Sequence, residues 1–249
     1  MIIIKNFEEI YKITKACYIV ARVLEELKGY LKEGLSTKKI EIFIENLISK
    51  MGGIPAFKGY RGYPASACIS INDQVVHGIP SDKVFIKEGD IVSIDVGVMY
   101  DGYYGDGAYT YGIGKITDNS KKLLKIVEES LYKGIEKARN GNRVGDISSA
   151  IQRHVETNGF SVVRAFVGHG IGRFLHEEPQ IPNFGKEGTG SKLRKGMTIA
   201  IEPMVNAGTH EVTILSDGWT VVTKDGSLSA HFEHTVVITD NEPEILTKM

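Results

Sequence analysis

The sequence has little of what a secreted or membrane protein would need. It contains two cysteines in 249 residues, Cys17 and Cys68, which have neither the spacing of a zinc knuckle nor the density of a disulfide scaffold. No apolar run approaches the roughly 18 residues of a membrane span, and the opening MIII is too short for a signal peptide. We therefore expect a cytoplasmic protein with no membrane partner, whose cysteines pack in the core.

An excess of charge of either sign is also absent. The 30 lysine and arginine residues nearly balance 31 aspartate and glutamate residues, for a formal net charge of −1. A nucleic-acid-binding domain normally carries a basic excess, so we expect no nucleic-acid partner. No linker rich in proline or serine interrupts the chain, which predicts a single domain over residues 1–249.

An internal repeat divides this domain into two similar halves, roughly residues 1–115 and 116–249. KEGDIVSIDVGV, from Lys87, resembles RKGMTIAIEPMV, from Arg194, after a shift of 107 positions. The same shift relates GLSTKKIEIFIENLISKMGG to GNRVGDISSAIQRHVETNGF, so that it covers both strand and helix patterns. The matched pairs include Gly34 and Gly141, Gly89 and Gly196, and Asp95 and Glu202.

Apolar periodicity predicts two helices and a set of antiparallel strands in each half. Helical stripes pass through Val20 to Leu31, Ile40 to Met51, Leu124 to Ile135 and Ile147 to Val155. Strands are predicted at Ile91 to Val98, Tyr103 to Tyr111, Thr198 to Val205, Trp219 to Thr223 and Phe232 to Ile238. The predicted class is α+β, with one curved antiparallel sheet, helices on its outer face and a cleft on its inner face.

Four carboxylates are expected on the inner face of this sheet. The period of two along a strand places Asp95 opposite Val92, Ile94 and Val96, and it places Glu202 and Glu233 similarly in their strands. No lysine or arginine shares those faces, and unpaired buried charges cost several kcal/mol each. Two divalent cations would balance the four negative charges.

The fourth carboxylate, Asp106, is placed by the hairpin that follows Asp95. A two-residue loop at 100 and 101 would make the two acids direct cross-strand partners, with Cβ atoms about 5 Å apart. A loop at 101 and 102 would instead make them diagonal neighbours on the same face. Both arrangements allow a shared ligand, whereas a three-residue loop without a bulge would separate the two acids.

Histidines supply the other candidate groups. His169 stands between glycines in GHGIG, where the backbone can approach a metal closely. Four oxygen ligands with one imidazole suit manganese, iron or cobalt and also admit zinc. His77 and His176 lie in long loops, where each could donate a hydrogen bond to a substrate carbonyl. For His231, beside Glu233, support of a metal ligand and simple packing are both open.

These residues lie in motifs that resemble the type I methionine aminopeptidases, metallopeptidases with the fold nicknamed pita-bread. The resemblance extends along essentially the whole chain. The matching motifs are FKGYRGYPASACISINDQVVHGIP, KEGDIVSIDVG, YYGDGAYTY, VGHGIGRFLHEEP, KGMTIAIEPM and DGWTVVTKDGSLSAHFEHT. It implies the α+β pita-bread fold, with a pseudo-twofold repeat of helix pairs on a curved antiparallel sheet.

The resemblance also implies a role for each site residue. A dinuclear metal centre would be held by Asp95, Asp106, His169, Glu202 and Glu233, with Asp106 and Glu233 bridging. Glu202 would be the catalytic base, and His77 and His176 would contact the substrate and its tetrahedral intermediate. The pocket for the first side chain would comprise Phe57, Tyr60, Tyr63, Cys68, Leu175 and Trp219. Some relatives carry phenylalanine where this chain has Leu175.

The implied activity is hydrolytic removal of the initiator methionine from nascent polypeptides by a cytoplasmic monomer in transient proximity to the ribosome. An Xaa-Pro aminopeptidase of the same fold normally has an additional N-terminal domain, whereas the first metal-binding strand here begins near residue 91. A non-catalytic, peptide-binding relative would be expected to lose ligands. A two-metal phosphoesterase would place basic side chains at the cleft, where Arg173 alone is near.

Overall fold

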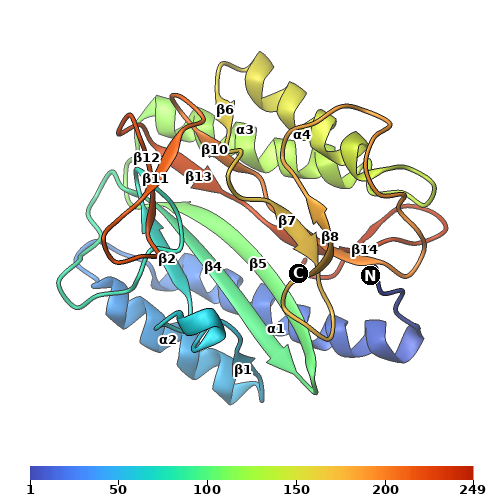
Figure 1. Cartoon of the computed structure of the whole chain (residues 1–249). Coiled ribbons are helices and arrows are strands. Elements are labelled where there is room, and N and C mark those ends of the chain that lie inside the picture. Colours follow the sequence, from blue (N-terminus) through green and yellow to red (C-terminus); the bar gives the residue numbers. More distant parts are fainter. Residues whose placement is uncertain (249) are drawn as a thin grey trace.

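Four α-helices and fifteen mostly short strands form the computed structural model, which describes residues 1–248 (Figure 1). The helices are α1 (Phe7–Tyr30), α2 (Thr37–Lys50), α3 (Asp118–Ile135) and α4 (Val144–Thr157). The strands of the N-terminal half are β1 (Ile54–Pro55), β2 (Cys68–Ile71), β3 (Gln74–Val76), β4 (Ile91–Tyr100) and β5 (Tyr103–Gly112). Those of the C-terminal half are β6 (Ser161–Val162), β7 (Gly168–Gly170), β8 (Glu177–Ile181), β9 (Thr198–Ile201), β10 (Met204–Asn206), β11 (Val212–Ile214), β12 (Val221–Thr223), β13 (Ser229–His231), β14 (His234–Val237) and β15 (Glu244–Ile245).

The shift of 107 positions found in the sequence is also a structural repeat. Helices α2 and α4 both have 14 residues, and their first residues, like those of β1 and β6, are 107 positions apart. Gly34 and Gly141 both adopt a positive φ, at 82° and 97°, which a side chain would disfavour. Each donates its N–H to an equivalent carbonyl, Gly34 to Ile86 and Gly141 to Leu193. The two halves therefore repeat in turn geometry as well as in sequence.

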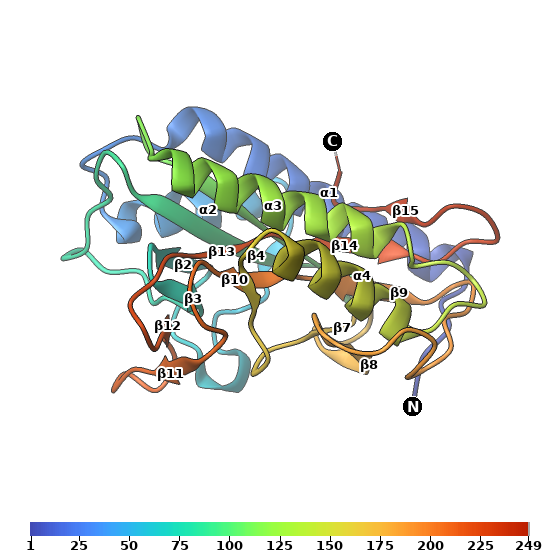
Figure 2. The same ribbon diagram turned by 90° about the horizontal axis from the view of Figure 1, so that it is seen from above.

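Helices cover one face of the strands, and each half has its own buried core. Figure 2 shows α1 and α3 on the same side of the strands. Helix α1 packs against β4 and β5, and α3 packs against β5, β9 and β13. The core of the first half includes Val20, Leu27, Ile44 and Ile94. The core of the second half includes Leu131, Ile151, Ile199 and Val236. Within residues 1–248, no helix combines the length and apolarity that crossing a membrane requires.

Hydrogen bonding divides the strands into four sheets rather than the single curved sheet that was predicted. The predicted strand over residues 198–205 is broken between β9 and β10 at Glu202 and Pro203, because proline has no N–H to donate. The predicted strand over residues 232–238 begins later, at His234. The halves meet where β5 contacts β14, with the Glu233 N–H donating to Ala108 at 2.9 Å and the Thr235 hydroxyl to Asp106 at 2.8 Å.

The hairpin register decides between the two predicted arrangements of Asp95 and Asp106. Tyr100 pairs with Tyr103, so the loop consists of Asp101 and Gly102, both with positive φ as a type I′ turn requires. Asp106 then lies opposite Gly97 and not opposite Asp95. The prediction of direct partners is wrong, and the diagonal alternative is correct. Both side chains still face the same side of the hairpin.

Candidate metal centre and the adjoining pocket

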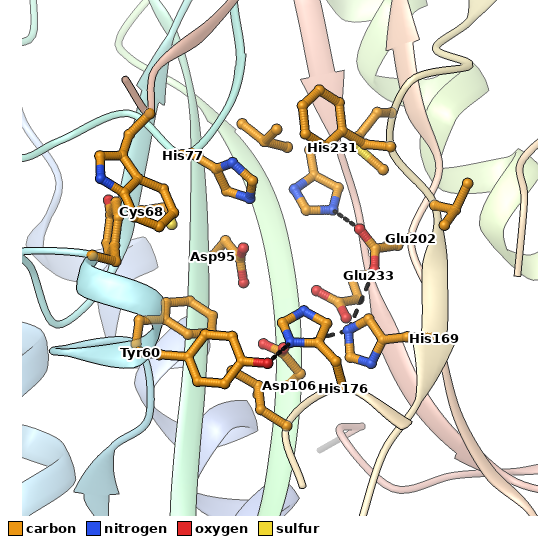
Figure 3. A pocket seen from close by; sticks show the side chains of 18 of the residues that line it. Tyr60, Cys68, His77, Asp95, Asp106, His169, His176, Glu202, His231 and Glu233 are labelled. Atoms are coloured by element: carbon orange, nitrogen blue, oxygen red, sulfur yellow. Dashed lines mark hydrogen bonds and ion pairs between the residues drawn. The ribbon is translucent and has the colours of Figure 1, made fainter. Parts of the chain in front are cut away.

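Five predicted side chains from five separate segments converge on one place (Figure 3). Asp95 projects from β4, Asp106 from β5 and His169 from β7. Glu202 directly follows β9, and Glu233 lies between β13 and β14. Both glutamates thus stand at interruptions of strands, where two sheets meet. The local breaks in hydrogen bonding bring the C-terminal acids to the two aspartates of β4 and β5.

The distances within this cluster suit metal coordination. The Nε2 atom of His169 lies 3.5 Å from Oε1 of Glu202 and 3.9 Å from Oδ2 of Asp106. One ligand atom from each of Asp106, His169 and Glu233 falls within 4.8 Å of the other two. The Nδ1 atom of His169 lies 2.9 Å from the Gly170 carbonyl, to which it can only donate. Its Nε2 lone pair is therefore directed toward the carboxylates.

Burial makes the carboxylates of the cluster hard to ionise together. It raises the pKa of Asp95 to about 7. The pKa values of Asp106, Glu202 and Glu233 lie well above their usual range, through burial first and then through the neighbouring acids. Burial lowers the pKa of His169 to about 4, so its imidazole is neutral and available as a ligand. Cations placed among these oxygens would favour the ionised carboxylates and so lower these pKa values.

Two unpartnered oxygens test whether the residues fit a metal. Oδ1 of Asp95 and Oε1 of Glu233 are buried and accept no hydrogen bond. Buried oxygens without a partner are rare and require an explanation such as an ion. Among the side chains described around this pocket, Arg61 alone is a lysine or arginine. Four carboxylates and one neutral imidazole, with oxygens left free, therefore fit divalent cations.

The glycines on either side of His169 make room for protein rather than for a metal. A Cβ atom at Gly168 would lie 2.4 Å from the Ala200 carbonyl oxygen, and one at Gly170 would lie 2.3 Å from that of Glu178. Strand β7 pairs with β9 and β8 at these positions. The GHGIG motif thus lets three backbones approach closely enough to hold His169 in place.

A pocket of about 270 Å³ opens beside the cluster. The predicted residues that line it are Phe57, Tyr60, Tyr63, Cys68, His77, Leu175, His176 and Trp219, together with the five residues of the cluster. Tyr63 anchors the apolar wall by donating from its hydroxyl to the Gly78 carbonyl at 3.0 Å, and its ring meets Trp219 edge-on. Cys17, by contrast, is buried away from this pocket in the core, as predicted.

The two predicted loop histidines stand on opposite sides of the pocket. His77 has a positive φ of 60°, and its ring meets Phe166 and Trp219 edge-on. Burial lowers its pKa, which favours the neutral form. His176 places Nδ1 2.8 Å from the Tyr60 hydroxyl, and its ring centroid lies 4.2 Å from that of His169 (Figure 3). Both imidazoles can thus reach a ligand lying against the cluster.

Several pocket residues were not predicted from the sequence. These are Arg61, Val76, Phe166, Val167 and Met204. For His231 the sequence is compatible with two roles, support of a metal ligand and simple packing. The structure places His231 beside Glu202, with Nε2 unpartnered and 3.9 Å from Oε2 of that glutamate. The sequence signal for this residue is its position two residues before Glu233. The structure adds that β13 pairs His231 with Met204, two residues beyond Glu202. Phe166 carries no comparable signal in the sequence.

Gly97 allows the aromatic wall to form, and adding a methyl group there is expected to damage the pocket. A Cβ atom at Gly97 would lie 2.4 Å from Cε1 of Phe57. Gly97→Ala should raise KM about tenfold for a substrate whose side chain enters the pocket, and it should lower stability by about 1–3 kcal/mol, because the ring must shift. Gly29→Ala is the control, since no atom lies within 4 Å of its Cβ position. Equal KM values for the two variants would contradict the assignment of Phe57 to the pocket.

Comparison with known proteins agrees with this geometry. The profile of metallopeptidase family M24 matches residues 11–240. A methionine aminopeptidase of Clostridium perfringens is 55% identical over 99% of both chains. The crystal structure of a methionine aminopeptidase from Thermotoga maritima superposes with a TM-score of 0.99, at 50% identity and full coverage of both chains.

A more distant structural relative is the prolidase from Pyrococcus furiosus, with a TM-score of 0.80 and 27% identity. The match covers 99% of this chain and 66% of the prolidase chain. These neighbours confirm the predicted pita-bread fold. The chain therefore belongs to metallopeptidase family M24 and, within it, to the methionine aminopeptidases.

Proposed function

We propose that the chain removes the N-terminal methionine from newly made polypeptides by metal-dependent hydrolysis. The observation that carries this proposal is the direct continuity of the carboxylate and imidazole cluster with the aromatic pocket. A peptide whose first side chain enters the pocket would present its amino group and its first carbonyl to the cluster. The apolar wall favours an unbranched thioether over a charged side chain.

Asp95, Asp106, His169, Glu202 and Glu233 are the residues that would hold two divalent cations. The chemistry that such cations supply when bound is a water of near-neutral pKa and a polarised peptide carbonyl. Manganese, iron and cobalt suit this donor set, and zinc is compatible with it.

Glu202 is proposed to move the proton. Its side chain is 13% exposed and faces the pocket, so it can accept a proton from the attacking water and deliver it to the leaving nitrogen. His77 and His176 would donate hydrogen bonds to the peptide and to the tetrahedral intermediate. Phe57, Tyr60, Tyr63, Cys68, Leu175 and Trp219 would form the methionine pocket.

The cellular setting completes the proposal. The substrate is a nascent chain, so the protein would act in the cytoplasm, as a monomer in transient proximity to the ribosome, with residues 1–249 forming one catalytic domain. A phosphate ester is expected to be a poorer substrate, because Arg61 is the single lysine or arginine described around the pocket. Arg173 is 60% exposed and pairs with Glu9 instead.

Chelation followed by metal restoration tests the proposal. We expect a chelator to abolish release of methionine from Met-Ala-Ser, and we expect manganese, iron or cobalt to restore it, because the cluster has no other source of positive charge. Free methionine is measured after each addition, with p-nitrophenyl phosphate assayed in parallel. Methionine release that persists in the chelated protein, or hydrolysis of the phosphate ester alone, would contradict the proposal.

A further inference from the structure

Lys5 is buried in a segment that is otherwise in contact with solvent. Among residues 1–12 it is the one buried residue, at 5% exposed, whereas Ile4 is 46% and Phe7 is 86% exposed. A lysine is seldom buried in a segment whose isoleucines are more exposed, because burial removes water from its charge. Its burial therefore indicates a specific partner.

The partner is Glu177, the first residue of β8. The Nζ atom of Lys5 lies 2.6 Å from Oε2 of Glu177, and the two side chains are 2% and 3% exposed. The other oxygen, Oε1, accepts the Phe174 N–H at 3.2 Å, so both carboxylate oxygens have partners. The lysine stem crosses Gly172, where a Cβ atom would lie 2.5 Å from Cε of Lys5. Lysine, glycine and glutamate thus form one closely packed unit.

This unit holds the loop that carries the pocket histidine. Residues 171–176 connect β7, which bears His169, to β8. The loop contributes Leu175 to the pocket wall and His176 to its rim (Figure 3). Lys5 is in turn fixed by its own N–H, which donates to the Gly196 carbonyl at 2.8 Å, just before the strand that leads to Glu202.

Net stability is a weak reason for burying this pair. Desolvation of two charges offsets most of their attraction, and apolar residues of similar size often stabilise a protein at least as well. What the pair provides is fixed geometry, since a short charge-assisted hydrogen bond and a backbone hydrogen bond meet on one carboxylate. That geometry reaches His176, the residue adjacent to Glu177.

We propose that Lys5 and Glu177 are positioning residues, which act on the reaction by holding His176 and Leu175 against the substrate. The proposal rests on the proposed aminopeptidase function. It assigns to the N-terminal segment, far from the metal centre in sequence, a part in the turnover of the peptide.

The test uses a double variant, Lys5→Met with Glu177→Gln, because a single substitution would leave one charge buried without a partner. We expect its kcat/KM for Met-Ala-Ser to fall by about 10- to 100-fold, with bound metal unchanged. Adding His176→Ala to the double variant should cost less than about threefold more, although His176→Ala alone should cost as much as the double variant, because coupled residues are non-additive. Lys5→Arg should keep most of the activity, since it retains the charge.

A readout independent of activity accompanies the kinetics. In protein labelled with ¹⁵N-histidine, the His176 ring signals, assigned with His176→Gln, should shift in the double variant. They should not shift in Lys121→Met, which breaks an exposed ion pair with Asp118 on α3. Three outcomes would each overturn the proposal. They are a kcat/KM loss from His176→Ala that multiplies with that of the double variant, a parental kcat/KM in the double variant, and His176 ring signals that do not shift. If the parent releases no methionine with any metal, the proposed function fails. The ring signals alone then show whether Lys5 and Glu177 position His176.

Discussion

Replacing Glu202 by glutamine is expected to lower kcat for Met-Ala-Ser about 1,000-fold, which lies within the usual contribution of a general base. The substitution keeps the shape of the side chain but removes its capacity to take a proton from water. It also removes one negative charge from a buried set of four, so the pKa of Glu233, which Glu202 helps to raise, should move back toward its ordinary range. Steady-state rates are measured after metal is restored, with bound metal quantified in each sample.

The matched control is Glu211→Gln, because Glu211 is exposed and pairs with Lys224 at the surface. It should keep the parental rate. A Glu202→Gln protein that carries the parental amount of metal and hydrolyses the peptide at the parental rate would exclude Glu202 as the base. A low rate explained entirely by lost metal would mean that Glu202 acts as a metal ligand and not as the base. Both the rate and the amount of bound metal must therefore be measured.

Much of the fold could be predicted because its signals are local and occur twice. The apolar stripe of α2 recurs in α4 after the same shift that relates their flanking glycines, so each assignment supports the other. The division into four sheets could not be predicted in this way. Alternating apolar residues continue past Glu202, and Pro203 interrupts hydrogen bonding without interrupting that pattern.

The candidate site was predictable to the extent that its residues lie on strand faces. The period of two placed Asp95 and Asp106 on one face, but the choice between direct and diagonal neighbours depended on which two residues form the turn. The contact between Lys5 and Glu177 has no local signal at all. It joins residues 172 positions apart, and one of them lies in a segment whose other side chains are exposed or partly exposed.

Without metal, the protein is expected to lose stability as the pH rises from about 4 to about 7. The pKa of Asp95 is about 7 in the folded chain against an ordinary value near 3.8, so the native state binds more protons than the unfolded state across this interval. Stability therefore decreases with rising pH, by up to about 4 kcal/mol for this carboxyl, since each pKa unit corresponds to about 1.4 kcal/mol. Bound cations favour the ionised acids, so the metal-loaded protein should not show this loss.

Asp95→Asn separates two effects of this carboxyl, which are its binding of metal and the stability that its buried charge costs in the metal-free protein. The variant should bind metal poorly and turn over little peptide, because a ligand has lost its charge. In the metal-free state at pH 8 it should nevertheless be more stable than the parent by about 2–4 kcal/mol, because asparagine has no charge to desolvate. Urea unfolding of both metal-free proteins at pH 5 and pH 8 gives the comparison, with Asp82→Asn in an exposed loop as the control.

If the metal-free parent were instead more stable at pH 8 than at pH 5, or if Asp95→Asn showed the same dependence on pH as the parent, the buried carboxyl would not be the source of the cost. The first of these outcomes would mean that the acids are tolerated without cations, and the physical reason for placing metal ions in this pocket would be lost.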